Sequence, residues 1–355
     1  MRILFMERWT SDPRGGTESI KTLFEEVSKE HETKFIWRGN RKTEEGEEAA
    51  KLYSNSISPY VPLEVEKLLL FLEPQLTGLY ERIDEFDPDL IVTQSESSYI
   101  AVKYAQENDC RSCVFLRAWE LLYASEKTHG GNMIVSKIAN SAIRPLNKRL
   151  ADYCLENADI LVANSKYTAG VYEDYIERDP EVVYPFVDLE KYRTEPGEKI
   201  LHVNPSKDKG IDLTLDVAEG MPEEHFIIAG NPSSEIAERI EGLENVECLG
   251  YVEDMKEAYS QTKIALVPSK WDEPFGRIPI EAGASGIPTV ASDRGGLQES
   301  VGEKALLALN QKPESYIEKI RQVDESYEEY SGKAKKNAEE KKIDHQINRF
   351  LNLIS

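Results

Sequence analysis

Two glutamates, Glu273 and Glu281, stand eight positions apart in the stretch EPFGRIPIE, on either side of a Pro-Phe-Gly turn. An apolar run, 263–270, precedes the turn, and Pro279 is typical of the first turn of a helix. Glu281 is therefore predicted near a helix N-terminus, where the helix dipole stabilises a carboxylate that can still accept two sugar hydroxyls. Taken alone, either glutamate is equally well explained as a support for the helix end.

Between the glutamates lie the backbone amides of Phe275, Gly276 and Arg277, which could face a phosphate group. Carboxylates that accept hydroxyls, together with amides that donate to a phosphate, point to a sugar nucleotide as the ligand. This is the most specific chemical pattern in the chain.

Two other loops occupy the same position between a strand and a helix. Gly15 and Gly16 follow the first apolar run, and amides exposed by such glycines form an anion site. In NPSKDKG, 204–210, Lys209 precedes a glycine and a helix and is well placed to meet a diphosphate. Each loop has a plainer explanation as well: a tight turn for the glycines and a solvated surface position for the lysine.

Apolar runs and amphipathic helices alternate twice along the chain, which predicts an α/β fold with two Rossmann-like doubly wound domains facing across a cleft. In such folds ligands bind beyond the carboxyl ends of the strands. The predicted strands are 2–6, 33–37, 89–93, 113–118 and 159–164 in the first series, and 199–204, 225–230, 246–252, 263–269, 288–292 and 305–309 in the second.

The domain boundary is predicted between the two series. The polar segment 187–199 carries one Pro-Gly pair and suits a hinge linker. We therefore expect a first domain over 1–190 and a second over 195–339. The last helix, 340–355, includes the amphipathic stretch INRFLNLIS, whose apolar face must pack on another element.

Composition narrows the class of partner and the compartment. The chain has 43 basic and 65 acidic residues, a formal net charge of −22, which opposes non-specific nucleic-acid binding. No apolar run reaches the roughly 20 residues that span a bilayer, and the opening MRILFMERWT suits a strand better than a signal peptide. A cytoplasmic protein without a nucleic-acid partner is predicted.

Cys110 and Cys113 have metal or redox spacing, but no second pair or nearby histidine completes a site, so we expect packing and no metal.

The stretch EPFGRIPIEAGASGIPTVASDRGGLQESV, 273–301, resembles the signature of glycosyltransferase family 4, the retaining GT-B enzymes with a Glu–seven residues–Glu motif. The resemblance extends over nearly the whole chain. The other matching stretches are GGTE at 15–18, FDPDLIV at 86–92, ANSKYT at 163–168, VVYPFVDLEKY at 182–192 and HVNPSKDKG at 202–210.

This resemblance implies a GT-B architecture in which the helix at 340–355 crosses back to the first domain. It implies retaining, metal-independent transfer of a sugar from a UDP- or GDP-sugar to a glycan, lipid-linked or small-molecule acceptor, without a cofactor. By position, Glu281 would hold the ribose hydroxyls and Glu273 would contact the transferring sugar as a catalytic residue, with Lys209 at the diphosphate. The other nucleotide-sugar contacts implied are Gly15, Gly16, Ser206, Lys207, Phe275, Gly276 and Arg277.

Two positions depart from the family pattern. Many members carry an arginine shortly before the diphosphate lysine, whereas this chain reads Asn-Pro-Ser-Lys at 204–207, so Lys207 or Arg277 would have to supply that cation. Many members also carry a histidine near the end of the strand at 113–118, where this chain has Arg117. Either Arg117 replaces it as a catalytic positive contact or the donor adopts a different pose.

The acceptor is expected on first-domain loops at 39–60 and 119–132. The stretch RAWELLY, 117–123, offers aromatic surfaces on which sugars stack. The segment 136–150 carries four cations and is either a solvated helix face or a peripheral membrane contact that reaches a lipid-linked acceptor at the cytoplasmic face. The acceptor-site candidates are Trp119, Glu120, Tyr123 and His129.

Two further functional classes fit the same plan. One contains the GT-B sugar-nucleotide epimerases, which need no acceptor, and the glycogen-type phosphorylases, which carry pyridoxal phosphate on a lysine. The other is a non-catalytic sugar-nucleotide-binding subunit, which the missing histidine and arginine leave open.

Overall fold

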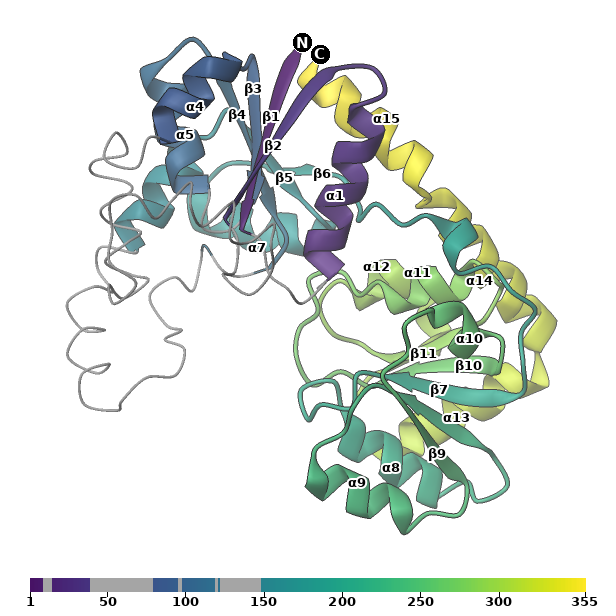
Figure 1. Ribbon diagram of the computed structural model, residues 1–355. Helices are drawn as coiled ribbons and strands as arrows, with labels where there is room; N and C mark the ends of the chain where they lie inside the picture. Colours follow the sequence, from purple (N-terminus) through teal and green to yellow (C-terminus); the bar gives the residue numbers. More distant parts are fainter. Residues whose placement is uncertain (9–14, 39–78, 95–97, 119–120, 122–147) are drawn as a thin grey trace. The chain divides into compact units, whose positions relative to one another are not determined.

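The computed structural model describes residues 1–8, 15–38, 79–94, 98–118, 121 and 148–355. The chain packs as two compact units, Met1–Val183 and Tyr184–Ser355. Within the described residues, each unit is built on a six-stranded sheet whose paired strands run parallel, with helices packed against it (Figure 1). The α/β class and the two doubly wound sheets predicted from the sequence are confirmed.

The sheet of the first unit has the order β2-β1-β3-β4-β5-β6. Its central strands are apolar and buried, as parallel strands covered on both faces require. The strands are β1 (Arg2–Arg8), β2 (Glu32–Arg38), β3 (Leu90–Gln94), β4 (Arg111–Leu116), β5 (Ile160–Ala163) and β6 (Glu181–Val182). The helices are α1 (Gly15–Val27), α4 (Leu79–Phe86), α5 (Ser98–Glu107), residues 148–157 and α7 (Lys166–Ile176).

The first helix packs an apolar stripe against the sheet. Ile20, Leu23 and Val27 of α1 are at most 1% exposed, and the ring of Phe24 meets Phe5 of β1 edge-on with centroids 5.4 Å apart. Because these residues recur every three or four positions, one side of the helix is apolar and lies on the sheet. The helix begins at Gly15 and is the first helix to follow β1 in the described residues.

The sheet of the second unit has the order β12-β11-β10-β7-β8-β9. The chain winds outward from β7 to β9, returns to β10 beside β7, and winds outward in the other direction. The strand order therefore reverses between β7 and β10, which is the topological switch point of a doubly wound sheet. The strands are β7 (Lys199–Val203), β8 (Phe226–Ala229), β9 (Val246–Gly250), β10 (Thr262–Val267), β11 (Thr289–Ser292) and β12 (Leu307–Ala308).

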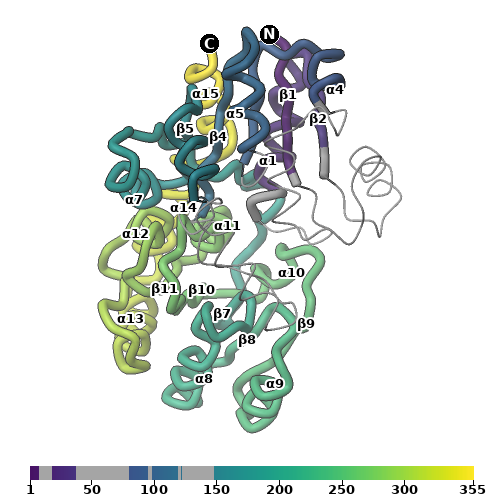
Figure 2. The backbone as a smooth tube through the Cα atoms, turned by 90° about the vertical axis from the view of Figure 1, so that its left-hand side faces the viewer, coloured from purple at the N-terminus to yellow at the C-terminus, as the bar shows by residue number. Residues whose placement is uncertain are grey.

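Alternate residues of these strands pack against helices on opposite faces. Ile228 of β8 packs with α8 and α9, whereas its neighbour Ile227 packs with α10 and α11. Figure 2 shows α8 and α9 on one side of β7 and β8 and α10 on the other. The helices are α8 (Ile211–Glu219), α9 (Ser234–Glu241), α10 (Met255–Tyr259), α11 (Ile278–Gly283), α12 (Leu297–Val301), α13 (Pro313–Glu325), α14 (Tyr327–Glu340) and α15 (Ile343–Ile354).

The segment that precedes β7 and the last helix both pack within the second unit. Leu189, in the predicted linker, is buried beside Phe275 and Ile280. The side chain of Gln346 in α15 accepts a hydrogen bond from the Tyr184 amide at 3.0 Å. The additional packing of residues 340–355 on the first domain, and the boundaries 1–190 and 195–339, stay predictions.

Candidate functional site

Two predicted site residues meet beyond the carboxyl ends of β7 and β10. Lys209 follows β7, Glu273 follows β10, and Lys209 Nζ lies 2.5 Å from Glu273 Oε1. The Lys209 side chain is 32% exposed and that of Glu273 only 10%, so the pair is open to solvent mainly on the lysine side. The strand order reverses between these strands, and in doubly wound folds ligands bind beyond the carboxyl ends of the strands at such a reversal.

The two loops that carry this pair are joined through their backbones. Lys270 N donates to the carbonyl of Asp208 at 2.9 Å. Gly210 has φ of +80°, and a Cβ there would lie 2.0 Å from the carbonyl oxygen of Pro268. Only glycine permits both the left-handed conformation and this close approach. The glycine therefore lets the lysine loop reach the end of β10.

Glu281, the second glutamate of the motif, lies in the first turn of α11 with an 8% exposed side chain. Its Oε1 is 3.1 Å from Arg277 Nε, and its Oε2 accepts a hydrogen bond from Tyr259 Oη at 3.0 Å. Burial, and the neighbouring Glu281 carboxylate, raise the pKa of Tyr259 well above its ordinary value, so the phenol stays protonated as a donor. A carboxylate has about four acceptor positions, which leaves capacity for two ligand hydroxyls.

The turn between the glutamates is held by its side chains. Phe275 is 2% exposed and packs with Ile280 and Ala284, so only its backbone is available to a ligand. Gly276 has φ of +84°, a conformation that favours glycine. Arg277 Nη2 donates to the hydroxyl of Tyr192 at 3.2 Å, in addition to its contact with Glu281.

The remaining loop residues have protein partners too. Lys207, the other candidate for the missing cation, is exposed, and its Nζ lies 2.8 Å from both carboxylate oxygens of Glu235. The carbonyl of Ser206 accepts hydrogen bonds from the amides of Lys209 at 3.1 Å and Ile211 at 3.3 Å. These bonds close the first turn before α8.

Sequence reasoning missed three supporting side chains. Tyr259 holds Glu281, and Ser269 Oγ lies 3.1 Å from Glu273 Oε1. His202 is buried and supports the loop: its Nε2 lies 3.2 Å from the carbonyl of Asn204, and Thr214 Oγ1 lies 2.8 Å from its Nδ1. Burial lowers the pKa of His202 to about 4, so the ring is neutral at pH 7. The one available signal was the position of Ser269 at the end of the strand predicted over 263–269.

In the first unit, Gly15 and Gly16 are the first two residues of α1, and their role as an anion site stays a prediction. Arg117 follows β4, and its guanidinium carbon lies 4.8 Å from the ring centroid of Phe115. The acceptor-site candidates Trp119, Glu120, Tyr123 and His129, the loop 39–60 and most of 136–150 lie outside the described residues.

The cysteines are free thiols, and Cys113 is buried as expected. Burial raises its pKa above the ordinary value of a thiol. Within the described residues no group of three or more His, Cys, Asp or Glu side chains is arranged to hold a metal ion.

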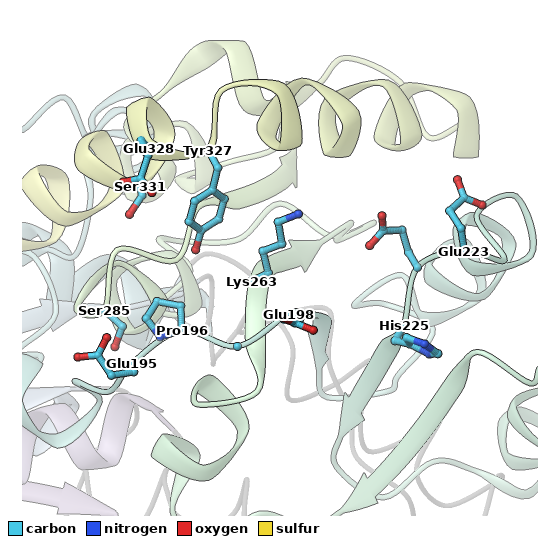
Figure 3. Close-up of a pocket in the computed structure, with 12 residues that line it drawn as sticks. Glu195, Pro196, Glu198, Glu223, His225, Lys263, Ser285, Tyr327, Glu328 and Ser331 are labelled. Carbon is cyan, nitrogen blue, oxygen red and sulfur yellow. The ribbon is translucent and has the colours of Figure 1, made fainter.

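A cavity of 760 Å³ lies at the opposite edge of the second sheet (Figure 3). It is lined by Glu198, His225 and Lys263, which stand at the amino ends of β7, β8 and β10. Lys263 Nζ lies 5.9 Å from the ring centroid of Tyr327, which also lines the cavity. Since Lys209 and Glu273 stand beyond the carboxyl ends, this cavity is separate from their site.

Models of known families match two parts of the chain. Residues 13–191 match Glycosyltransferase Family 4, and residues 198–325 match Glycosyl transferases group 1. The chain belongs to glycosyltransferase family 4. The motif carrying Glu273 and Glu281 lies inside the second match, and Gly15, Gly16 and Arg117 lie inside the first.

Relatives of this family 4 chain are distant. D-inositol 3-phosphate glycosyltransferase of Corynebacterium urealyticum is 28% identical over 220 residues, which cover 50% of this chain and 52% of that protein. The chain thus spans about half the length of such curated relatives.

Two solved structures show the fold. Anabaena HepE in complex with UDP superposes with a TM-score of 0.77 at 17% identity, covering 100% of this chain and 99% of that one. Sucrose-phosphate synthase of Thermosynechococcus elongatus superposes with a TM-score of 0.70 at 17% identity, covering 99% and 98%. The fold of this family 4 chain is therefore GT-B. No helix within the described ranges is both long and apolar enough to cross a bilayer.

Proposed function

We propose that this chain transfers a sugar from a nucleotide-diphosphate sugar to an acceptor, retaining the anomeric configuration and requiring no metal ion. The observation that carries the proposal is the contact between Lys209 and Glu273 at the switch point of the second sheet, with Glu281 buried at the start of the next helix. Membership of glycosyltransferase family 4 supports it, as do the solved HepE complexes with UDP and UDP-glucose.

Each of these residues has a role that its surroundings favour. Lys209 would turn its ammonium to the diphosphate, which carries more negative charge than one carboxylate. Glu281, oriented by Arg277 and Tyr259, would accept the two ribose hydroxyls with its remaining lone pairs. Glu273 would contact the transferring sugar, where positive charge develops at the anomeric carbon in an oxocarbenium-like transition state.

Metal independence follows from the same assignment. Charge on the departing diphosphate would be stabilised by Lys209 and by backbone amides of the turn 275–277, in the manner of a preorganised oxyanion site. Turnover should therefore persist unchanged in excess EDTA. Loss of turnover that added Mg²⁺ or Mn²⁺ restores would contradict this part of the proposal.

The test begins with thermal-shift measurements against UDP, GDP, ADP and uridine. A nucleotide at 100 times its Kd should add about 2.7 kcal/mol to the free energy of unfolding. The corresponding sugar nucleotides are then followed by NMR for hydrolysis, transfer and the anomeric configuration of the product. Conversion to an isomeric sugar nucleotide without an acceptor would identify an epimerase instead. Nucleotide binding without any turnover would identify a non-catalytic subunit.

A further inference from the structure

The carboxyl edge of the first sheet carries buried polar side chains at the ends of three strands, and a half-buried arginine at the end of a fourth. Glu7 at the end of β1, Gln94 at the end of β3 and Asn164 just beyond β5 are 4%, 5% and 7% exposed. Arg117, just beyond β4, lies over the ring of Phe115. Buried polar groups are normally hydrogen-bonded, so each group here calls for an account of its partner.

The strand register places these side chains on one face of the sheet. Gln94 pairs with Phe115, and Phe115 pairs with Val162. Neighbours in a parallel register point to the same face, as do residues two positions apart. Arg117 and Asn164, two positions beyond Phe115 and Val162, therefore join Gln94, and the contact of Arg117 with the Phe115 ring agrees with this.

Two oxygens of this group lack a donor. Gln94 Oε1 and Asn164 Oδ1 are fully buried and have no hydrogen-bond partner within the described residues. The orientation of the Asn164 amide is determined, because its Nδ2 donates to the carbonyl of Arg117 at 2.9 Å. Turning the amide over would place Oδ1 against the carbonyl oxygen of Arg117, and two acceptors cannot bond each other. Oδ1 is therefore the atom without a donor.

We propose that Gln94 and Asn164 bind the acceptor through its neutral hydroxyl groups, so that the acceptor presents a sugar or another polyol to the first unit. This inference rests on the proposed function. An amide oxygen needs a hydrogen-bond donor, which a hydroxyl supplies and a phosphate dianion does not. Strands β3 and β5 are two positions apart in the sheet, about 10 Å, so one ligand with several hydroxyls reaches both side chains.

A neighbouring residue provides a matched control. Thr93 precedes Gln94 and is fully buried, and its hydroxyl also has no partner within the described part of the chain. It pairs with Val114 and so points to the opposite face of the sheet from Gln94. Thr93→Val therefore removes an equally unpartnered polar atom without touching the proposed acceptor face.

The experiment uses saturation-transfer NMR on the full chain, in the presence of UDP, to measure the affinity of small polyhydroxyl probes. The probes are myo-inositol and the methyl glycosides of glucose, mannose, galactose and N-acetylglucosamine. At least one probe should bind wild type, and Gln94→Met should weaken its affinity roughly tenfold. Gln94→Glu, which keeps an acceptor oxygen, should retain binding, and Thr93→Val should stay within about twofold of wild type. Since Gln94→Met removes an unpaired buried oxygen, its melting temperature should be unchanged or higher.

Donor hydrolysis separates this proposal from the one on which it rests. Wild type and Gln94→Met should hydrolyse the sugar nucleotide equally in the absence of acceptor. Equal affinity of a probe for wild type and Gln94→Met, an equal loss in Thr93→Val, or no binding by any probe would overturn the acceptor assignment. Reduced donor hydrolysis in Gln94→Met would place these hydroxyl contacts on the donor sugar and likewise overturn it. Absence of hydrolysis and transfer in wild type would instead remove the proposed function itself.

Discussion

The carboxyl edge of the second sheet carries two ion pairs, Lys209 with Glu273 and Arg277 with Glu281. At the carboxyl edge of the first sheet, by contrast, Gln94 Oε1 has no hydrogen-bond partner within the described residues. A ligand at the second edge must exchange its own groups for contacts that the protein already makes. A ligand at the first edge adds hydrogen bonds that the protein lacks. Substitutions should therefore cost folding stability as well as binding at the second edge, and binding alone at the first.

The largest effect is expected for Glu273→Gln. Loss of one electrostatic contact to a developing charge lowers kcat by roughly 10²–10³-fold. The affinity for bare UDP should stay the same or rise, because Lys209 no longer shares its ammonium with a carboxylate. Steady-state kinetics and calorimetry measure the two quantities. Glu235→Gln, which unpairs the exposed Lys207 instead, is the control and should leave kcat unchanged.

Acid should distinguish the two edges through His202. The folded-state pKa of about 4 lies below the ordinary 6.5, so the unfolded chain binds the proton more readily and stability falls as the pH drops from 6.5 toward 4. This difference in pKa between the folded and unfolded states corresponds to a loss of about 3 kcal/mol in the free energy of unfolding. As the pH falls to 5, the hydrogen-exchange protection of the amides at 204–210 should decrease before that of the amides at 90–94.

His202→Asn supplies the comparison, since its side chain stays neutral throughout this range. The pH dependence of its unfolding free energy should be flatter than that of wild type. His345→Asn, at an exposed position of α15, should keep the wild-type dependence. The same slope in all three proteins would mean that the buried imidazole is not what acid titrates.

Lys209→Met should weaken UDP binding by roughly ten- to hundredfold, because a charge-assisted contact to the diphosphate is lost. Uridine, which has no phosphate, should bind as it does to wild type. Lys207→Met tests the other candidate cation of the same loop, and a change in UDP affinity of less than about twofold would leave Lys209 as the lysine that meets the diphosphate. If the affinity of Lys209→Met falls equally for uridine and for UDP, the substitution has disrupted the whole loop.

Lys209→Met should also be less stable than Lys207→Met. Its partner Glu273 is left almost buried without a cation, whereas Glu235, the partner of Lys207, is exposed to water. Equal melting temperatures for the two variants would contradict the contrast drawn between paired and unpaired edges.

The smallest effect is expected for Tyr259→Phe, which removes the donor to Glu281 Oε2. The KM for the donor should rise several-fold with kcat nearly unchanged, since ribose contacts are present both before and during the reaction. The free energy of unfolding should fall by about 1 kcal/mol. Tyr316→Phe removes another buried phenol, which accepts from Gln311 at 3.2 Å, and should reproduce the loss of stability without the change in KM.

Much of the fold could be predicted because its signals are local. The alternation of apolar runs with helical stripes marks each strand and helix within a few residues, and Ile20, Leu23 and Val27 face the core as their spacing requires. The ends of strands were predicted less accurately. The strand expected at 113–118 ends at Leu116 in the structure, so Arg117 lies just beyond it. The apolar run stops at Leu116, and Ala118 beyond Arg117 suggested a longer strand, but the backbone hydrogen bonds that end a strand depend on its neighbours.

The sequence by itself determined which chemistry is present: carboxylates around a turn at Glu273 and Glu281, and a lysine before the glycine that opens a helix. Only the tertiary structure decided which atoms partner which. Lys209 meets Glu273 across 64 positions because β7 and β10 are neighbours at the strand reversal, and Tyr259 reaches Glu281 because α10 and α11 share a face. The unpaired oxygens of Gln94 and Asn164 are equally invisible in the sequence. Periodicity reports the environment of a residue along its own element, whereas hydrogen-bond partners come from whichever elements the strand order brings alongside.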